Sequence, residues 1–295
     1  MTQHTPIPPD LRRWIAENLP DRATDTAEDV SWDRRDSRVW RVPTAESEAF
    51  VKLSPSPEDY EREVAGYAYA ARVLAPQEAP RLLAAHPGLR AIMTSLQPGS
   101  VVRGLSLSRE EELRVHERAG NLLRRWHDAS APASQRDRDS TRASMDGRAS
   151  EAAACLEATA GYLDDEQRSL VECVAHGLPQ LAEHLPVAYL HGDYSTRNWL
   201  WDPLLGYGVI DFEMSAHGVV IEEFVWLRGA VWAPRPDLRT AFFTGYGRTL
   251  SDTEERALCL LTARLGVSYL ATGLSRRNPV LIERGHLVLD RLTRG

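Results

Sequence analysis

The sequence predicts an α+β protein with two lobes, and three observations support this prediction. The chain has 295 residues, of which 43% are hydrophobic, which is enough to bury two cores. Short apolar runs between polar turns dominate the first third of the chain. Apolar residues at helical spacing dominate most of the remainder. A strand-rich first lobe and a helical second lobe follow from this division.

The first third of the chain contains alternating segments typical of strands, together with two segments typical of helices. A helix over residues 9–19 is stopped by Pro20. A longer helix over 58–75 has Tyr60, Val64 and Tyr67 on one face. The predicted strands cover residues 30–32, 38–42, 49–53, 81–85 and 89–93, and the last two flank a His-Pro-Gly turn.

The remainder of the chain is mainly helical, with a short strand-rich insert. Ser108 followed by Glu111 predicts a capped helix that runs to Asp128. Residues 130–150 are rich in Ser, Asp and Arg, which predicts a loop. Further helices are predicted over 150–163, 164–185, 219–230, 251–270 and 280–292, short strands at 187–190, 198–201 and 206–210, and a turn at 216–218.

The segment His191-Gly192-Asp193-Tyr194-Ser195-Thr196-Arg197-Asn198 and the later Asp211-Phe212-Glu213 carry the candidate chemistry. The predicted strands place Asp193 and Asn198 in one loop and bring Asp211 beside them. An acid, an amide and a second acid suit Mg²⁺, which binds oxygen ligands together with substrate phosphates. Asp193 can accept a proton from an attacking hydroxyl. This combination is typical of phosphoryl transfer.

The pattern His-Gly-Asp, Asn198 and Asp-Phe-Glu resembles the aminoglycoside phosphotransferase family, small-molecule kinases with a protein-kinase-like fold. The resemblance implies an N-terminal nucleotide-binding lobe over residues 1–97, built from about five antiparallel strands and one main helix. It implies a helical C-terminal lobe over 98–295 with the catalytic loop and substrate site. It also implies that Asp193 is the catalytic base, that Asn198 and Asp211 bind Mg²⁺, and that ATP is the phosphoryl donor.

Lys52 is the only lysine in a chain that otherwise uses arginine. A compact ammonium and a planar guanidinium are not interchangeable, so its retention indicates a chemical role. The resemblance places Lys52 against the α- and β-phosphates of ATP. Both Glu61 and Glu63 are candidates to pair with it, and the family pattern favours Glu63.

The remaining nucleotide contacts are implied by the resemblance alone. The turn at residues 33–37 corresponds to the loop that covers the phosphates, but it has no glycine, so Ser37 and two arginines would replace it. The segment 94–99 corresponds to the hinge, where Thr94 and Leu96 match the positions whose backbone holds adenine. Met93 fits either the back of this pocket or an ordinary core position.

Composition narrows the substrate and the partners. The net charge of −7 argues against general nucleic-acid binding and is compatible with a small cationic substrate. No apolar stretch reaches the ~20 residues of a membrane span, and the N-terminus has no signal segment, so we expect a cytoplasmic enzyme. Glu213, Glu222 and Asp252 are candidates to receive ammonium groups. The oligomeric state is open between monomer and dimer.

The resemblance favours phosphorylation of an antibiotic, an aminoglycoside or a basic peptide, with resistance as the outcome. Relatives with the same core phosphorylate choline, homoserine or sugars, so a metabolite kinase is the first alternative. A nucleotide-binding pseudokinase is a second, because the phosphate loop lacks glycine. A metal-dependent hydrolase is a third, although such a site would need more clustered histidine and carboxylate ligands.

Overall fold

The computed structural model describes residues 6–19, 27–31, 38–44 and 47–294. The chain divides into two compact units. Unit 1 comprises Met1–Leu105 together with His191–Ala216, and unit 2 comprises Ser106–Leu190 together with His217–Gly295. The predicted lobe boundary between residues 97 and 98 stays a prediction. The segment that carries the candidate chemistry packs with the N-terminal part of the chain.

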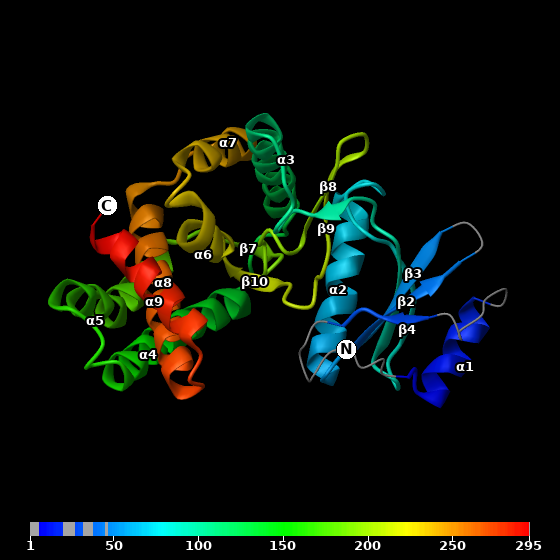
Figure 1. Cartoon of the computed structure of the whole chain (residues 1–295), viewed down its shortest axis with the longest axis horizontal. Helices are drawn as coiled ribbons and strands as arrows, with labels where there is room; N and C mark the ends of the chain where they lie inside the picture. The colour runs from blue at the N-terminus through cyan, green and yellow to red at the C-terminus, as the bar shows by residue number, and fades with distance from the viewer. Residues whose placement is uncertain (1–5, 20–26, 32–37, 45–46, 295) are drawn as a thin grey trace. The chain divides into compact units, whose positions relative to one another are not determined.

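A five-stranded antiparallel sheet forms the centre of unit 1, as the sequence predicts (Figure 1). Its spatial order is β1-β2-β3-β5-β4, so β5 lies between β3 and β4. Two helices accompany the sheet, α1 (Pro9–Asn18) and α2 (Pro57–Val73). The strands are β1 (Glu28–Asp29), β2 (Arg38–Pro43), β3 (Glu48–Leu53), β4 (Leu82–His86) and β5 (Ala91–Ser95).

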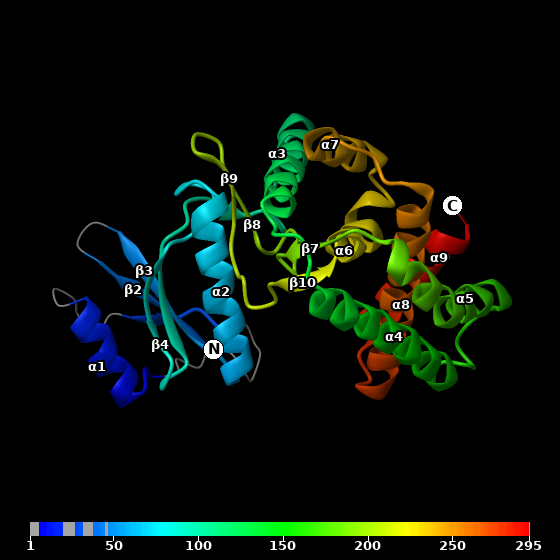
Figure 2. The ribbon, with the colours of Figure 1, turned by 180° about the vertical axis from the view of Figure 1, so that it is seen from behind.

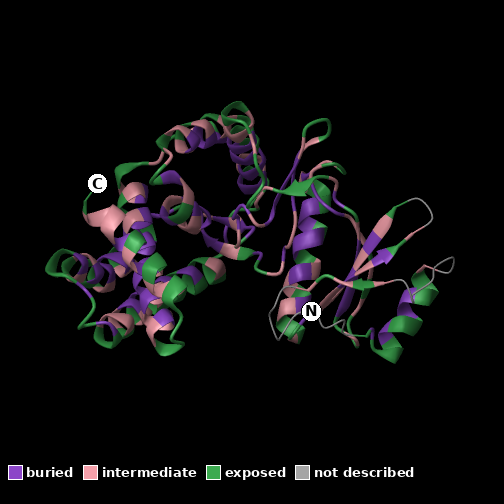
Figure 3. Ribbon diagram, viewed as in Figure 1, coloured by how far each residue is buried: buried purple, intermediate pink, exposed green. Residues whose placement is uncertain are grey.

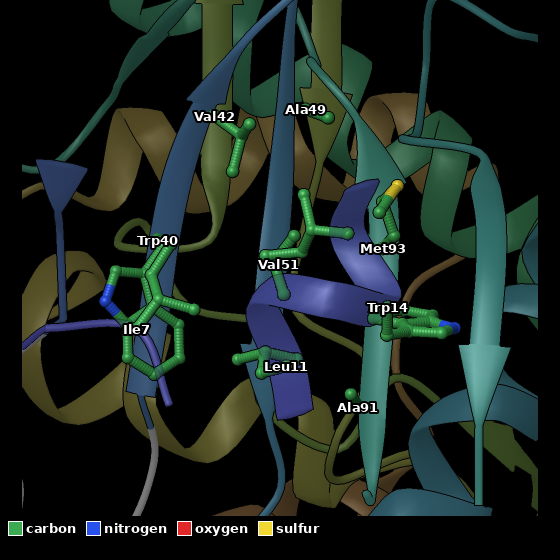
Figure 4. Packing of buried hydrophobic residues seen from close by; sticks show 10 residues of the cluster. Ile7, Leu11, Trp14, Trp40, Val42, Ala49, Val51, Ala91 and Met93 are labelled. Atoms are coloured by element: carbon green, nitrogen blue, oxygen red, sulfur yellow. The ribbon is translucent and has the colours of Figure 1, made fainter. Parts of the chain in front are cut away.

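The two faces of this sheet have different partners because side chains alternate along a strand. Val51 of β3 lies opposite Met93 of β5, and both belong to the hydrophobic core under α1. Figure 4 shows this core with Leu11 and Trp14 of α1. Lys52 points to the other face, where it bonds a residue of α2. Figures 1 and 2 agree that α1 and α2 lie on opposite faces of the sheet.

Two smaller sheets accompany the candidate motif. The strands β6 (Ser100–Val101), β8 (Trp199–Asp202) and β9 (Gly206–Val209) form an antiparallel sheet. The strands β7 (Val187–Leu190) and β10 (Ala216–Val219) form a two-stranded sheet. The predicted turn at 216–218 is therefore wrong. Its glycine serves close packing instead, because a Cβ on Gly218 would lie 2.7 Å from Leu190 Cδ1.

Unit 2 begins with α3 (Arg109–Asp128), whose N-terminus has the capping box that Ser108 and Glu111 predict. This helix packs against α7 (Pro236–Tyr246). The approach is close, since a Cβ on Gly120 would lie 1.9 Å from the Phe242 carbonyl oxygen. A glycine in a helix lowers its intrinsic stability, and here it allows two backbones to touch.

The predicted loop at residues 130–150 is wrong, because α4 extends over Gln135–Ala158. Ser134 and Asp137 form a capping box at its N-terminus. The buried face uses mostly small side chains, so the helical periodicity of large apolar residues is absent from this stretch. The buried residues of α4 are Thr141, Met145, Ala149 and Ala152.

The other helices of unit 2 pack mainly on one another. Among the described residues, α8 alone has the length and composition of a membrane span, yet 56% of that stretch is buried inside the structure. It packs against α4, α5 and α9 as a core helix does, and Figure 3 shows buried residues along α8 itself. The helices are α5 (Asp165–Leu181) with the 3-10 turn Ala182–His184, α6 (Glu222–Leu227) with the π-helical turn Arg228–Trp232, α8 (Asp252–Ser275) and α9 (Pro279–Thr293).

Candidate active site

His191 anchors the loop that follows β7 and precedes β8. Its side chain is buried, and its Nε2 lies 3.1 Å from the Ile210 carbonyl oxygen. The Asp193 backbone N–H donates to His191 Nδ1 at 3.3 Å, and the Ser215 hydroxyl donates to the His191 carbonyl at 3.2 Å. The tautomer that satisfies both ring contacts carries its proton on Nε2. His191 therefore holds the loop against Ile210, the residue that follows β9.

Gly192 is required by the shape of this loop. Its φ is +86°, a conformation that residues with a Cβ rarely adopt. A Cβ at this position would also lie 2.1 Å from the Met214 carbonyl oxygen. The loop thus passes close to the segment that follows Asp211, and only glycine fits at the point of approach.

The Asp193 carboxylate is bound on one oxygen only. Oδ2 accepts from Arg197 Nε at 2.9 Å and from Asn198 Nδ2 at 2.9 Å, and Arg197 Nη2 donates to it as well. Oδ1 accepts no hydrogen bond from any residue that the structure describes. The side chain is 19% exposed, so this second oxygen is the one available to a substrate hydroxyl.

Asn198 and Asp211 offer oxygen ligands side by side. The Ile210 backbone N–H donates to the Asn198 carbonyl at 3.0 Å, which holds the residue before Asp211 against the loop. The amide nitrogen of Asn198 faces Asp193, bonding both its carbonyl and Oδ2, which leaves Asn198 Oδ1 turned away as a ligand atom. Asp211 accepts a hydrogen bond from Lys52 on Oδ1, and its carboxylate can offer a second oxygen to a cation. This donor set fits Mg²⁺, which prefers carboxylate and carbonyl oxygens.

Asp211 has a strained backbone, with φ of +71°. Few residues other than glycine adopt this conformation, although Asp and Asn do so more often than most. Such strain concentrates at functional sites, where the surrounding structure enforces it. Here the lower-cost residue would be glycine, so the presence of a carboxylate points to a use for its charge.

Lys52 is surrounded by three carboxylates. Its ammonium donates to Glu63 Oε1 at 2.9 Å, Asp211 Oδ1 at 2.9 Å and Glu213 Oε2 at 2.8 Å. All three of its N–H groups are therefore used. The Glu63 side chain is only 1% exposed, whereas Glu213 is 19% and Asp211 30% exposed. The sequence-based choice of Glu63 over Glu61 as the partner agrees with this geometry.

The charges of this cluster shift one another. Burial lowers the pKa of Lys52, but the three carboxylates outweigh it and hold that pKa well above its ordinary value. Burial raises the pKa of Glu63 to about 7, against the opposing effect of Lys52. Burial also acts to raise the pKa of Asp211, but Lys52 overcomes this and the pKa is lowered. Lys52 and Asp211 are thus held in their charged forms.

The predicted hinge segment is only partly available to a nucleotide. Thr94 of β5 is buried. The Leu96 backbone N–H already donates to the Glu48 carbonyl at 3.2 Å. Adenine contacts at Thr94 and Leu96 therefore stay predictions, and a contact through the Leu96 N–H would have to replace this bond.

Met93 is a core residue and does not line the face of Lys52. It packs under α1, and the residue opposite Lys52 is Ile92. Successive side chains of a strand point to opposite faces of the sheet, so Met93 lies on the opposite face from its neighbours Ile92 and Thr94. The sequence could therefore have predicted the face of Met93. The predicted phosphate contact at Ser37 lies outside the described residues.

Two of the three acids proposed to receive substrate ammonium groups have partners of their own. Glu213 bonds Lys52 in unit 1. Glu222 of unit 2 pairs with Arg148 at 3.1 Å, and burial raises its pKa. Asp252 is an exposed residue in the first turn of α8. Contacts of these three acids with a substrate ammonium group therefore stay predictions, and Glu213 would first have to leave Lys52.

Arg197 and Glu213 are the participants that sequence reasoning missed in these roles. Both signals were present. Arg197 follows Asp193 by four residues and precedes Asn198, and Glu213 lies two residues beyond Asp211. Neither spacing identifies a contact by itself, because the loop at Asp193 and the left-handed turn at Asp211 set the directions of these side chains.

Comparison with known proteins places this geometry in a family. The model of a group described as the phosphotransferase enzyme family, APH, matches residues 26–259. Compared by sequence with curated proteins, the chain matches none of them.

Several solved structures share the fold over nearly the whole chain. The GDP and kanamycin complex of APH(2")-IIia is 16% identical, with a TM-score of 0.67 over 96% of this chain and 98% of that one. The streptomycin-ATP-APH(2")-IIa ternary complex is 14% identical, with a TM-score of 0.67 over 98% and 99%. The macrolide 2'-phosphotransferase MphH from Brachybacterium faecium is 16% identical, with a TM-score of 0.61 over 96% and 98%.

Proposed function

Because the chain belongs to the phosphotransferase enzyme family, we propose that it transfers the γ-phosphoryl group of ATP to a hydroxyl of a small cationic antibiotic, an aminoglycoside or a basic peptide. The observation that carries this proposal is the grouping of Lys52, Asp193, Asn198 and Asp211 in one unit. Each has the residue type that phosphoryl transfer requires. The proposed site of action is the cytoplasm, where ATP is available, and the proposed result is resistance.

Asp193 is the proposed catalytic base. Its Oδ1 accepts the proton of the substrate hydroxyl as the oxygen attacks the γ-phosphorus, and the bond between this phosphorus and the β,γ-bridging oxygen of ATP breaks. The products are the phosphorylated substrate and ADP. The carboxylate is partly exposed, and Arg197 binds it through Oδ2. Oδ1 can therefore accept from a hydroxyl without first losing a hydrogen bond.

Asn198 and Asp211 are the proposed metal-binding residues, through Asn198 Oδ1 and Asp211 Oδ2. When bound, Mg²⁺ supplies positive charge that offsets the negative charge developing on the phosphate oxygens. Asp211 suits this role because Lys52 keeps it ionised. Asn198 suits it because its amide nitrogen is held by Asp193, which fixes the direction of its oxygen.

Lys52 is the proposed phosphate-binding residue, and Glu63 orients it. All three N–H groups of Lys52 are bonded to carboxylates, so a phosphate oxygen must replace one of them. Glu63 is buried, and Asp211 is assigned to the metal. Glu213 is therefore the partner that a nucleotide phosphate displaces.

The proposed substrate class rests on charge and on related structures. The net charge of −7 favours a cation. Structures with this fold are complexes with kanamycin and with streptomycin, and their identities of 16% and 14% carry the fold alone.

The decisive test is ATP consumption by the purified protein with Mg²⁺ against aminoglycosides, basic cyclic peptides, macrolides, choline and homoserine. We expect one antibiotic class to stimulate turnover, and Asp193→Ala to abolish that stimulation. Stimulation by choline or homoserine alone would replace the antibiotic with a metabolite. ATP binding without turnover in any reaction would identify a pseudokinase. Expression in a susceptible host tests the resistance role by the rise in the inhibitory concentration.

A further inference from the structure

We propose that Arg197 is a positioning residue for the catalytic base, holding Asp193 so that Oδ1 alone faces the substrate hydroxyl. The inference rests on the proposed function, since it assigns Asp193 as the base. It adds a residue that the phosphoryl-transfer motif does not include.

The contact is made within one loop. Arg197 donates from Nε and from Nη2 to the same oxygen, Asp193 Oδ2, and Asn198 Nδ2 donates to it as well. Three donors on one oxygen leave it no further capacity to accept a proton from substrate. The other oxygen, Oδ1, receives no hydrogen bond from the part of the chain that the structure describes.

The loop backbone makes this arrangement rigid. The Ser195 backbone N–H donates to the Asp193 carbonyl at 2.8 Å, and the Asn198 backbone N–H donates to the Ser195 carbonyl at 2.9 Å. These two bonds bring residues four and five positions after the aspartate back onto its carboxylate. Arg197 and Asn198 then both donate to Oδ2, and these hydrogen bonds oppose rotation of the carboxylate.

An arginine suits this position better than other residues. Its planar guanidinium presents two N–H groups in a fixed fork, whereas lysine provides a single flexible point charge. The pair is partly exposed, 30% for Arg197 and 19% for Asp193, so its worth to folding is small. A contact of little value to stability, placed on the catalytic carboxylate, is best explained by the geometry that it imposes.

A base held in the productive orientation reacts without first finding it. Removing the fork should therefore lower kcat and change the binding of ATP only little, because Arg197 donates its hydrogen bonds to Asp193 and acts on Asp211 of the Lys52 group through charge alone. A role in binding nucleotide would instead raise the KM for ATP.

The test compares Arg197→Met with Arg197→Lys in the full-length protein, using the acceptor that gives an Asp193-dependent rate. Arg114→Met is the matched control, because Arg114 also follows its acidic partner by four residues, with Arg114 Nη2 lying 3.1 Å from Glu110 Oε1 on the exposed side of α3. We expect Arg197→Met to lower kcat by about 10- to 100-fold with the KM for ATP changed by less than about threefold. Arg197→Lys should recover part of the rate, and the control should match the wild type.

A second comparison shows whether Arg197 acts through the base. In the Asp193→Ala background the carboxylate is absent, so adding Arg197→Met should leave the residual rate unchanged within about twofold. A further loss in this double variant would mean that Arg197 acts directly on the phosphoryl group or the substrate, and would overturn the inference.

The outcomes separate this inference from the proposed function. A wild type without any Asp193-dependent rate overturns the proposed function, and the inference falls with it. An Asp193-dependent rate that Arg197→Met leaves unchanged overturns the inference alone. A rate that rises in Arg197→Met also overturns it, because the contact of Arg197 with Asp193 would then inhibit the base.

Discussion

Two groups of charged and polar residues differ in their balance of donors and acceptors. The Lys52 cluster is Lys52 with Glu63, Asp211 and Glu213, and the Asp193 cluster is Asp193 with Arg197 and Asn198. At Lys52 one ammonium binds three carboxylates, so the cluster carries an excess of negative charge. At Asp193 one carboxylate oxygen binds three donors and the other oxygen binds none among the described residues. The excess negative charge of the Lys52 cluster favours a cation. In the proposed mechanism Lys52 must give up one of its three hydrogen bonds to bind a phosphate oxygen. In the Asp193 cluster Oδ2 already accepts three hydrogen bonds, so Oδ1 is the acceptor that it offers to a substrate.

The difference also separates stability from catalysis. The Glu63 side chain is only 1% exposed, so we expect changes in the Lys52 cluster to lower both the stability of the fold and the activity. Asp193 and Arg197 are partly exposed, so changes there should affect the rate and spare the fold. The predictions below test this contrast.

The largest effect on rate is expected at Asp193. Asp193→Asn removes the charged acceptor while keeping the size of the side chain. We expect kcat to fall by about 10³-fold, within the range for loss of a general base, with ATP affinity nearly unchanged. Rate and nucleotide titration measure the two quantities separately. An equal loss of both would mean that Asp193 belongs functionally with the Lys52 cluster.

The largest effect on stability is expected at Lys52. Lys52→Met leaves three carboxylates without their cation, one of them buried, and breaking a buried pair costs about 3–5 kcal/mol. We expect a lower free energy of unfolding by denaturant and a strong loss of ATP binding. The double variant Lys52→Met with Glu63→Gln should recover part of the stability. If Lys52→Met unfolds at the wild-type denaturant concentration, the cluster is solvated and its part in folding is wrong.

Gly192 tests whether the Asp193 cluster depends on backbone geometry. Gly192→Ala adds a Cβ where Met214 leaves no space, at a positive φ, so the loop must move. We expect kcat to fall by at least about tenfold, since small misplacement of a base is costly. Gly206→Ala is the matched control, because φ there is +96° but no atom lies within 4 Å of the added Cβ. Equal losses in the two variants would attribute the effect to φ alone.

The smallest effect is a dependence of stability on pH. Burial raises the pKa of Glu63 to about 7 from an ordinary 4.5, so the folded state binds a proton that the unfolded state has released. The stabilisation is fully present below pH 4.5 and is lost as the pH rises to about 7. The stability of the wild type relative to Glu63→Gln should therefore fall across this range, by about 1 kcal/mol per pH unit.

The control for this measurement is Glu61→Gln, which removes a charge from the exposed side of the same helix. A constant difference between the wild type and Glu63→Gln from pH 4.5 to 7 would show that Glu63 stays ionised beside Lys52. A constant difference for Glu61→Gln is expected.

The sequence by itself determined the five-stranded sheet, the helix α2 and the loop that carries Asp193 and Asn198. Their signals are local: alternation in β2 and β3, helical spacing in α2, and the spacing of Asp193, Asn198 and Asp211. The single lysine was also informative, because charge chemistry limits what can replace it. A helix or strand can be predicted from local sequence where the propensities and the apolar spacing of its residues both favour that element.

Tertiary structure alone decided the features that depend on a distant partner. The helix α4 is stabilised by burying small residues against other helices, a contact that its own composition does not indicate. The strand β10 exists because β7, earlier in the chain, pairs with it. The contact of Glu213 with Lys52 also joins residues far apart in the chain, and it accompanies the left-handed backbone at Asp211. These outcomes depend on three-dimensional neighbours, which the order of residues does not specify at short range.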